Sequence, residues 1–276
     1  MVRYTGRFSA PALRRFARNP ASGGRDFIVA DIHGQYAELM AQLAAVAFDV
    51  RRDRLFSAGD LIDRGPSSIE CLELLREPWF HAVLANHETM MLTALRNRPS
   101  AYHNPSAWLA NGGQWVLALP DEDKARLAAL LPLVEQNPLV MTVDHPDGRF
   151  NMAHAQLTRP DTGAPFQDAD LRNEALLEDA EVLLTWGRTL YSETMRCSMR
   201  ADVGLGAGEA LAVTGAPFER GLSLTYVGHT PVRRCWLHRS HFFMDRGAGL
   251  TDGSGQLLVL EHADVMAKLR GAGICD

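Results

Sequence analysis

Apolar, strand-like runs alternate with helix-like patterns over the first third of the chain. The runs cover residues 26–30, 55–58 and 79–84, and an aspartate or asparagine follows each within two residues. After the first run, apolar residues recur at the spacing of one helix face: Tyr36, Leu39, Met40, Leu43 and Val46. A second helix is expected over residues 66–76, and a third after the last run. This repetition predicts an α/β fold with parallel strands packed by helices.

The pattern changes after Pro138, where short apolar runs follow one another without long helices between them. Six further strands are expected over these runs: Leu139–Val143, Arg149–Ala153, Ser223–Val227, Arg234–Leu237, His241–Met244 and Leu257–Leu260. Residues 96–133 are expected to form helices and loops. Residues 190–222 are rich in glycine and weakly periodic, which predicts a long loop or flap over a site.

Composition restricts the class of protein. The 276 residues are 46% hydrophobic and 22% charged, which is typical of an ordinary globular protein. The net charge of −5 provides no basic field for nucleic acid, and no apolar run approaches the roughly 18 residues that span a membrane. The four cysteines are far apart, which favours reduced thiols and a cytoplasmic location. Nothing in the composition sets the oligomeric state.

The first 25 residues differ from the rest in charge. They contain six arginines and no acid: Arg3, Arg7, Arg14, Arg15, Arg18 and Arg25. An organelle transit peptide has this composition, and so does a solvated arm. We predict a basic N-terminal arm over residues 1–25, with a short helix over 11–17. Residues 26–276 are predicted to form a single domain, because both halves supply residues to one site.

Polar residues able to bind metal follow the predicted strands. They are Asp31, His33, Asp60, Asn86, His154 and His229. Because sites in open α/β sheets form beyond the carboxyl ends of strands, we expect these side chains to converge. A carboxylate can bridge two cations about 3.5–4 Å apart, and two cations that share a water lower its pKa towards neutrality. The mixed oxygen and nitrogen set suits Mn²⁺, Fe or Zn²⁺ better than Ca²⁺.

Three neighbouring residues suit phosphoryl chemistry. Arg64 offers a guanidinium fork that matches two phosphate oxygens. His87 directly follows Asn86, so its ring can face a substrate beside the metals. Asp63 is the carboxylate expected to orient that ring and to raise its pKa, which would make His87 a general acid for the leaving group.

These residues fall in an ordered set of motifs: Asp31-x-His33-Gly34, Gly59-Asp60-x-x-Asp63-Arg64-Gly65, Asn86-His87-Glu88, His154-Ala155 and Gly228-His229-Thr230-Pro231. The set resembles the phosphoprotein phosphatase family of metallophosphoesterases, and in particular the phage lambda type and its bacterial relatives. Three shorter segments resemble the same subgroup: Asn111-Gly112-Gly113-x-Trp115, Trp186-x-Arg188 and Asp245-x-Gly247-Ala248.

The resemblance implies an α/β/β/α sandwich, the calcineurin-like metallophosphoesterase fold. It also implies a role for each matching residue: Asp31, His33 and Asp60 would hold the first metal; Asp60, Asn86, His154 and His229 the second; Arg64 and Arg188 would bind phosphate; and His87 with Asp63 would protonate the leaving oxygen. Two divalent ions are implied, with Mn²⁺ the usual choice in bacterial members. The implied substrate is a phosphorylated protein or a small phosphoester.

The chain departs from the family pattern at three positions. Leu84 stands where relatives have a phosphate-binding arginine, and Ala85 stands where they have glycine. The lost charge-assisted hydrogen bond is worth roughly 1.5–3 kcal/mol. Arg246 stands where relatives usually have threonine, and we hypothesise that Arg246 binds phosphate and partly compensates for Leu84.

Three functions compete. The first is a phosphatase for phosphoserine and phosphothreonine, with phosphotyrosine a further substrate, and Asn-His-Glu supports it. The second is a hydrolase of dinucleoside polyphosphates such as diadenosine tetraphosphate, a branch that tends to have aspartate at the position of Glu88. The third is a phosphate-binding protein without turnover. Trp108 and Trp115 are expected to build core, and residues 111–115 to pack a helix end.

Overall fold

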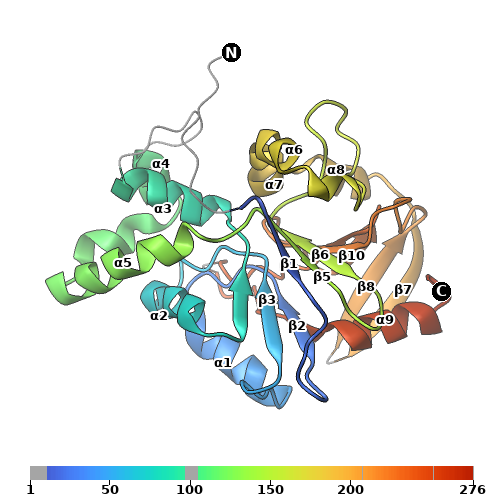
Figure 1. Cartoon of the computed structure of the whole chain (residues 1–276), viewed down its shortest axis with the longest axis horizontal. Helices are drawn as coiled ribbons and strands as arrows, with labels where there is room; N and C mark the ends of the chain where they lie inside the picture. Colours follow the sequence, from blue (N-terminus) through green and yellow to red (C-terminus); the bar gives the residue numbers. More distant parts are fainter. Residues whose placement is uncertain (1–10, 97–104, 207, 251, 276) are drawn as a thin grey trace.

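Two β-sheets packed face to face form the centre of the molecule, and helices lie on the outer side of each sheet (Figure 1). This computed structural model describes residues 11–96, 105–206, 208–250 and 252–275. The arrangement confirms the predicted α/β/β/α sandwich.

The smaller sheet contains the three strands predicted in the first third of the chain. Its spatial order is β12 (Val259–Glu261), β2 (Asp26–Val29), β3 (Arg54–Ser57) and β4 (Phe80–Ala82). The last three are parallel, and β12 runs antiparallel to β2. Helix α1 (Tyr36–Ala45) joins β2 to β3, and α2 (Ser68–Glu73) with the 3₁₀ turn η1 (Leu74–Arg76) joins β3 to β4. The predicted strand–helix repeat is confirmed.

The larger sheet is mixed and has eight strands. Their spatial order is β1 (Leu13–Phe16), β5 (Val140–Val143), β6 (Phe150–Ala153), β9 (Leu224–Val227), β11 (His241–Phe243), β10 (Cys235–His238), β8 (Glu209–Thr214) and β7 (Met199–Gly206). Parallel β6–β9 and β9–β11 pairs lie at its centre. The carboxyl ends of β6, β9 and β11 therefore point the same way.

The apolar residues of strands β2 and β3 are buried on both faces of the smaller sheet. Successive side chains of a strand point to opposite faces. Ile28 and Phe56 pack between the two sheets, whereas Phe27 and Leu55 pack against the helices outside. Continuous burial of this kind is typical of parallel strands that are covered on both sides.

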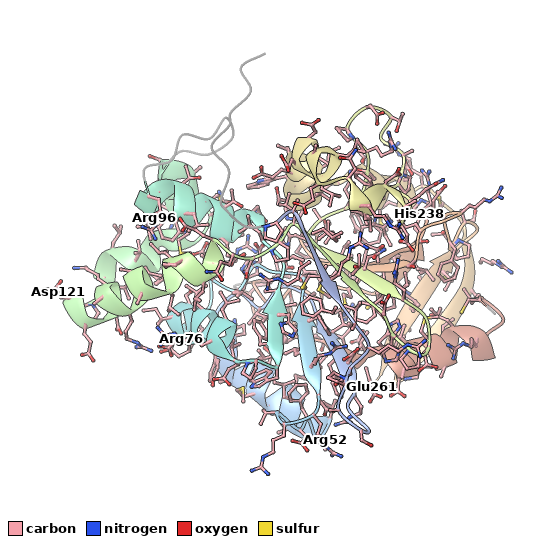
Figure 2. All side chains as sticks on the ribbon, viewed as in Figure 1. Arg52, Arg76, Arg96, Asp121, His238 and Glu261 are labelled. Atoms are coloured by element: carbon pink, nitrogen blue, oxygen red, sulfur yellow. The ribbon has the colours of Figure 1, made fainter. Side chains whose placement is uncertain are left out.

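The remaining helices complete the outer layers and one end of the sandwich. Their bounds are α3 (Asn86–Arg96), α4 (Pro105–Ala110), η2 (Gly113–Ala118), α5 (Asp121–Val134), η3 (Asp170–Arg172), α6 (Glu174–Asp179), α7 (Glu181–Trp186), α8 (Thr189–Thr194) and α9 (His262–Gly271). Charged side chains such as Arg52 and Asp121 project from the surface (Figure 2). None of the helices in the described ranges has the length and apolar character needed to cross a bilayer.

Three predictions about local structure are wrong. Residues 13–16 form an edge strand paired with β5, so the helix predicted over 11–17 and a wholly solvated arm are both incorrect. Ala12 and Leu13 are buried there, and this burial decides the conformation. Residues 1–10 lie outside the described residues. The predicted loop over 190–222 contains helix α8 and the hairpin of β7 and β8, which extends the larger sheet beyond β10.

Candidate dinuclear metal centre

The six predicted metal ligands lie just beyond the carboxyl ends of five strands. Three of these strands belong to the smaller sheet and two to the larger sheet. Asp31 and His33 follow β2, Asp60 follows β3, Asn86 follows β4, His154 follows β6 and His229 follows β9. Each of these side chains belongs to a residue that is at most 6% exposed. The face-to-face packing of the sheets therefore brings together residues that are up to 198 positions apart in sequence, as the hydrogen bond from His229 to Asp31 shows.

Asp60 lies at the centre of this group. Its Oδ2 atom is 3.6 Å from Nε2 of His33, 3.8 Å from Nε2 of His87 and 3.5 Å from Nε2 of His154. Two sets of three residues place ligand atoms within 4.8 Å of one another in the described structure: His33, Asp60 and His87 in one, and Asp60, His154 and His229 in the other. Because Asp60 belongs to both sets, its position suits a carboxylate that bridges two cations.

Lone-pair atoms of three residues face one another on one side of Asp60. Oδ1 of Asn86 is 2.6 Å from Nε2 of His154 and 3.2 Å from Nδ1 of His229, and the two histidine nitrogens are 3.1 Å apart. Nδ1 of His154 donates to the carbonyl oxygen of Ala58, so Nε2 keeps its lone pair. Atoms bound to one cation at 2.0–2.2 Å are themselves about 3 Å apart. The spacing therefore fits a shared ion.

The other predicted histidine ligand has the same kind of support. Nδ1 of His33 lies 2.9 Å from the carbonyl oxygen of Ile62, to which it donates, and this leaves the lone pair on Nε2. Metal-binding histidines typically donate their second ring nitrogen in this way. Burial lowers the pKa of His33 to about 3, and burial also lowers the pKa values of His154 and His229. Neutral imidazoles are the form that binds metal.

The carboxyl groups of the site are crowded, which also fits bound cations. Burial and the charges of Asp245 and Asp60 raise the pKa of Asp31 well above its usual range. Burial raises the pKa of Asp245 to about 6 and that of Glu88 to about 8, with the charge of Asp60 contributing to both. Buried carboxylates repel one another unless positive charge lies between them. The donor set and its charge therefore fit two divalent ions.

Backbone strain is concentrated at the site. Positive φ angles, which cost an L-residue roughly 1–2 kcal/mol, occur at five residues of the predicted site. These are His33, Asp60, Asp63, Arg64 and His229. Gly228 precedes the last of them, and a Cβ atom there would overlap Oδ1 of Asp31. The turns after the strands thus bring backbone close to the metal ligands at an energetic cost, as functional sites often do.

His87 differs from the other histidines of the site. Its Nδ1 atom donates to Oδ2 of Asp63 over 2.6 Å, and both side chains are buried. Burial lowers the pKa of His87, but the charge of Asp60 and the hydrogen bond to Asp63 outweigh it, so the pKa lies above its usual value. By distance, His87 could be the third ligand of the set that contains His33 and Asp60. Oδ2 of Asp31 lies 4.0 Å from Nε2 of His33, so Asp31 can take that place instead. The raised pKa favours His87 as a proton donor over His87 as a ligand.

Two arginines stand at the exposed side of the site. Nη1 of Arg64 donates to Nε2 of His33 over 2.8 Å, and Nη2 lies 3.1 Å from Nε2 of His87, so the guanidinium stands between the predicted ligand and the predicted acid. Arg188, just before α8, is exposed, and its charge helps to lower the pKa values of His154 and His229. Each half of the site therefore has one exposed arginine that can bind phosphate oxygens.

The structure does not bring Arg246 to the other predicted site residues. Its Nε atom forms an ion pair with Oε2 of Glu209 at 3.2 Å, and Nη1 donates to the carbonyl oxygen of Val232. Leu84 is only 3% exposed and packs in the same hydrophobic cluster as Phe27 and Leu55. These contacts do not support the hypothesis that Arg246 compensates for Leu84, because its guanidinium is bound elsewhere.

Sequence reasoning assigned no role to two acidic residues that support the ligands. Both oxygens of Glu88 accept backbone hydrogen bonds, from Asp60 at 3.0 Å and from Leu61 at 2.8 Å, so Glu88 fixes the turn that presents Asp60. Asp245 follows β11 and is buried against Asp31. Both lie in the quoted motifs, so the signal was present, but only the fold shows which ligands they contact.

The sandwich and its centre, with Asp60 between two ligand sets, define a metallophosphoesterase. The sequence model of the calcineurin-like phosphoesterase family matches residues 27–233, and the chain belongs to this family. The family predicted from the motifs is thereby confirmed.

Two curated relatives carry different activities in their names. The serine/threonine-protein phosphatase 1 of Salmonella typhimurium is 43% identical over 129 residues, which are 47% of this chain and 57% of the relative. The symmetrical bis(5'-nucleosyl)-tetraphosphatase of Klebsiella pneumoniae is 36% identical over 138 residues, 48% of this chain and 43% of the relative. The chain thus spans about half the length of these curated relatives.

A solved structure supports the fold. A mutant of cold-active protein tyrosine phosphatase matches over 90% of this chain and 77% of its own, with a TM-score of 0.50 and 17% sequence identity. At this identity the likeness concerns the fold alone.

Proposed function

We propose that the protein is a metal-dependent phosphatase that hydrolyses phosphoserine and phosphothreonine monoesters in proteins. The observation that carries the proposal is the convergence around Asp60. One face holds ligand atoms of Asn86, His154 and His229 at about the spacing of a bound cation, and the other face places His87 and Arg64 together. The similarity to a bacterial serine/threonine-protein phosphatase supports the same reading.

The residues of the proposed site fall into three roles: metal binding, phosphate binding and proton transfer. Two divalent ions, held by the predicted ligands, would supply an activated water and neutralise phosphate charge. Arg64 and Arg188 bind the phosphate oxygens, where a planar guanidinium forms paired hydrogen bonds. His87 carries a proton on Nε2 to the departing serine or threonine oxygen, and Asp63 holds the proton on Nδ1 and keeps the ring in place. We take phosphotyrosine as a further substrate of the same site.

We propose Mn²⁺ as the metal, with Fe and Zn²⁺ as the other ions that this donor set suits. Three imidazoles, two carboxylates and one amide oxygen match metals of intermediate softness. The cytoplasmic location stays a prediction and rests on the wide spacing of the four cysteines along the chain.

A hydrolase of dinucleoside polyphosphates is the second candidate, favoured by the 36% identity to a tetraphosphatase. The two functions separate in one assay. Metal-free protein is loaded with Mn²⁺ and offered a phosphoserine peptide and diadenosine tetraphosphate in parallel. We expect the higher kcat/KM on the phosphopeptide. A higher kcat/KM on diadenosine tetraphosphate would replace the proposed substrate. If neither compound were hydrolysed, the proposal that the protein is an enzyme would be rejected.

A substitution tests the metal centre itself. Asp60→Asn removes the bridging charge but keeps the shape, and we expect fewer than two bound ions and a loss of activity of about 10³-fold or more. Asp161→Asn is the matched control, because Asp161 is exposed and pairs with Arg159. Metal content by mass spectrometry and kcat/KM are the readouts. A wild-type protein that binds at most one ion, or an Asp60→Asn variant with full activity, would contradict the proposal.

A further inference from the structure

The Asp63 carboxylate accepts more hydrogen bonds than the pairing with His87 requires. Oδ2 accepts from Nδ1 of His87 at 2.6 Å and from Nε1 of Trp108 at 2.9 Å. Oδ1 accepts from Nε1 of Trp115 at 2.7 Å, with a longer contact of 3.2 Å from Trp108. Asp63 is fully buried, so these three N–H groups account for its side-chain hydrogen bonds in the described structure. Two indoles and one imidazole therefore fix the plane of the carboxylate.

A pair of glycines delivers the tryptophans to this carboxylate. Gly112 lies between α4 and η2 with a φ of +117°, and a Cβ there would be 3.0 Å from Cγ of Arg64. A Cβ on Gly113 would be 2.6–2.7 Å from the ring of Trp108. The positive φ disfavours a side chain at Gly112, and the overlap with the Trp108 ring disfavours one at Gly113. The segment expected only to pack a helix end is thus seated directly on the turn that contains Asp63.

Packing explains Trp108 more completely than it explains Trp115. Trp108 is 1% exposed and lies in the hydrophobic core, where its N–H needs some partner. Trp115 is half-buried and meets Trp108 edge to face, with ring centroids 6.2 Å apart. Its N–H bonds to Asp63, although a half-buried indole could also donate to water. At Trp115 the hydrogen bond is therefore separable from the burial of the ring.

We propose that Trp115 is a positioning residue for the proton transfer: its indole N–H holds the Asp63 carboxylate so that Oδ2 faces Nδ1 of His87 and Nε2 faces the leaving oxygen. The torsion that rotates an aspartate carboxylate is broad, so donors on both oxygens are needed to fix it. A catalytic group that is misplaced by about 1 Å can lose about 10²-fold in rate. The inference rests on the proposed phosphatase function.

The test exploits leaving groups that differ in their need for a proton. Trp115→Phe keeps a ring and removes the N–H. With Mn²⁺ bound, we expect kcat on a phosphoserine peptide to fall about 10–100-fold with KM changed less than about threefold, since general acid catalysis contributes about 10²–10⁴-fold. On p-nitrophenyl phosphate, whose leaving group needs no proton, kcat should fall less than about threefold. His87→Asn should show the same selectivity with a larger loss.

The control and the contrary outcomes are distinct. Trp236→Phe makes the same chemical change in β10, where the partly buried ring packs against hydrophobic core residues. It should leave kcat on both substrates within about threefold of wild type. Equal losses on both substrates in Trp115→Phe, or no loss on either, would overturn the inference while wild-type activity upheld the proposed function. A wild-type protein inactive on every phosphoester would overturn both.

Discussion

Oδ1 of Asn86 lies 2.6 Å from Nε2 of His154, so two atoms that carry lone pairs face each other in the buried interior. Nδ1 of His154 already donates to Ala58, and the lowered pKa of His154 keeps its ring neutral. Such a contact is unfavourable unless a cation joins the two atoms.

Metal removal should therefore destabilise the protein. Treatment with a chelator is expected to lower Tm by several degrees, and added Mn²⁺ should restore it in proportion to the logarithm of its concentration, because the ion binds only the folded state. Differential scanning fluorimetry measures this. His154→Ala should respond much less to Mn²⁺ than wild type. A Tm that is indifferent to chelator and metal would contradict the assignment.

His87→Asn separates a proton donor from a metal ligand. As a donor, His87 contributes about 10²–10⁴-fold to the rate, so kcat on phosphoserine should fall by that factor while two ions stay bound. Metal content and kcat are measured on the same sample. If the variant binds only one ion, His87 is a ligand of the first metal, as the distance to Asp60 would also allow.

Arg188 and Arg246 are predicted to behave differently when replaced by alanine. Arg188 is exposed beside the second ligand set, and losing its hydrogen bonds to phosphate, worth roughly 1.5–3 kcal/mol, should lower kcat/KM by about 10–100-fold. Arg246 pairs with Glu209, so Arg246→Ala should change kcat/KM less than about threefold and mainly lower stability. The reverse order in steady-state kinetics would restore the phosphate-binding role of Arg246.

Gly113→Ala should reduce stability through direct overlap. The new Cβ would meet the Trp108 ring at 2.6–2.7 Å, and overpacking of this kind costs about 1–3 kcal/mol. Gly204→Ala in β7 is the control, because no atom lies within 4 Å of a Cβ at that position. Urea unfolding compares the two variants. Equal midpoints would mean that the ring moves aside without cost.

Acid should destabilise the fold through a histidine outside the site. Burial lowers the pKa of His262 to about 3, compared with about 6.5 in an unfolded chain. As pH falls from about 6.5 towards 3, the unfolded state binds this proton first, so stability decreases by up to about 1.4 kcal/mol per pH unit. The free energy of unfolding of His262→Gln should fall less steeply in this window. Parallel curves for variant and wild type would refute the role of His262.

Much of the fold was accessible from local patterns. The helix at residues 36–45 and strands β2, β3 and β4 were predicted because a continuous apolar run or a helical face directly reflects burial. The strand at residues 13–16 was missed, since its sequence, Leu-Arg-Arg-Phe, has no strong periodicity and its pairing with β5 is a contact across more than 120 positions. The hairpin of β7 and β8 was missed for a different reason: its glycines suggest a loop, and only the pairing of β8 with β10 shows that it extends the sheet.

The sequence by itself indicated which polar side chains would meet, because each follows an apolar run and the carboxyl ends of neighbouring parallel strands lie at one edge of a sheet. Only the tertiary structure decided how those groups are used. It showed that Asp60 is shared by two ligand sets, that Arg246 turns to Glu209, and that two tryptophans hold Asp63. These are distances of about 3 Å between residues far apart in the chain, and hydrogen bonding falls off steeply beyond that distance. Motif order does not encode such distances, whereas the packing of two sheets does.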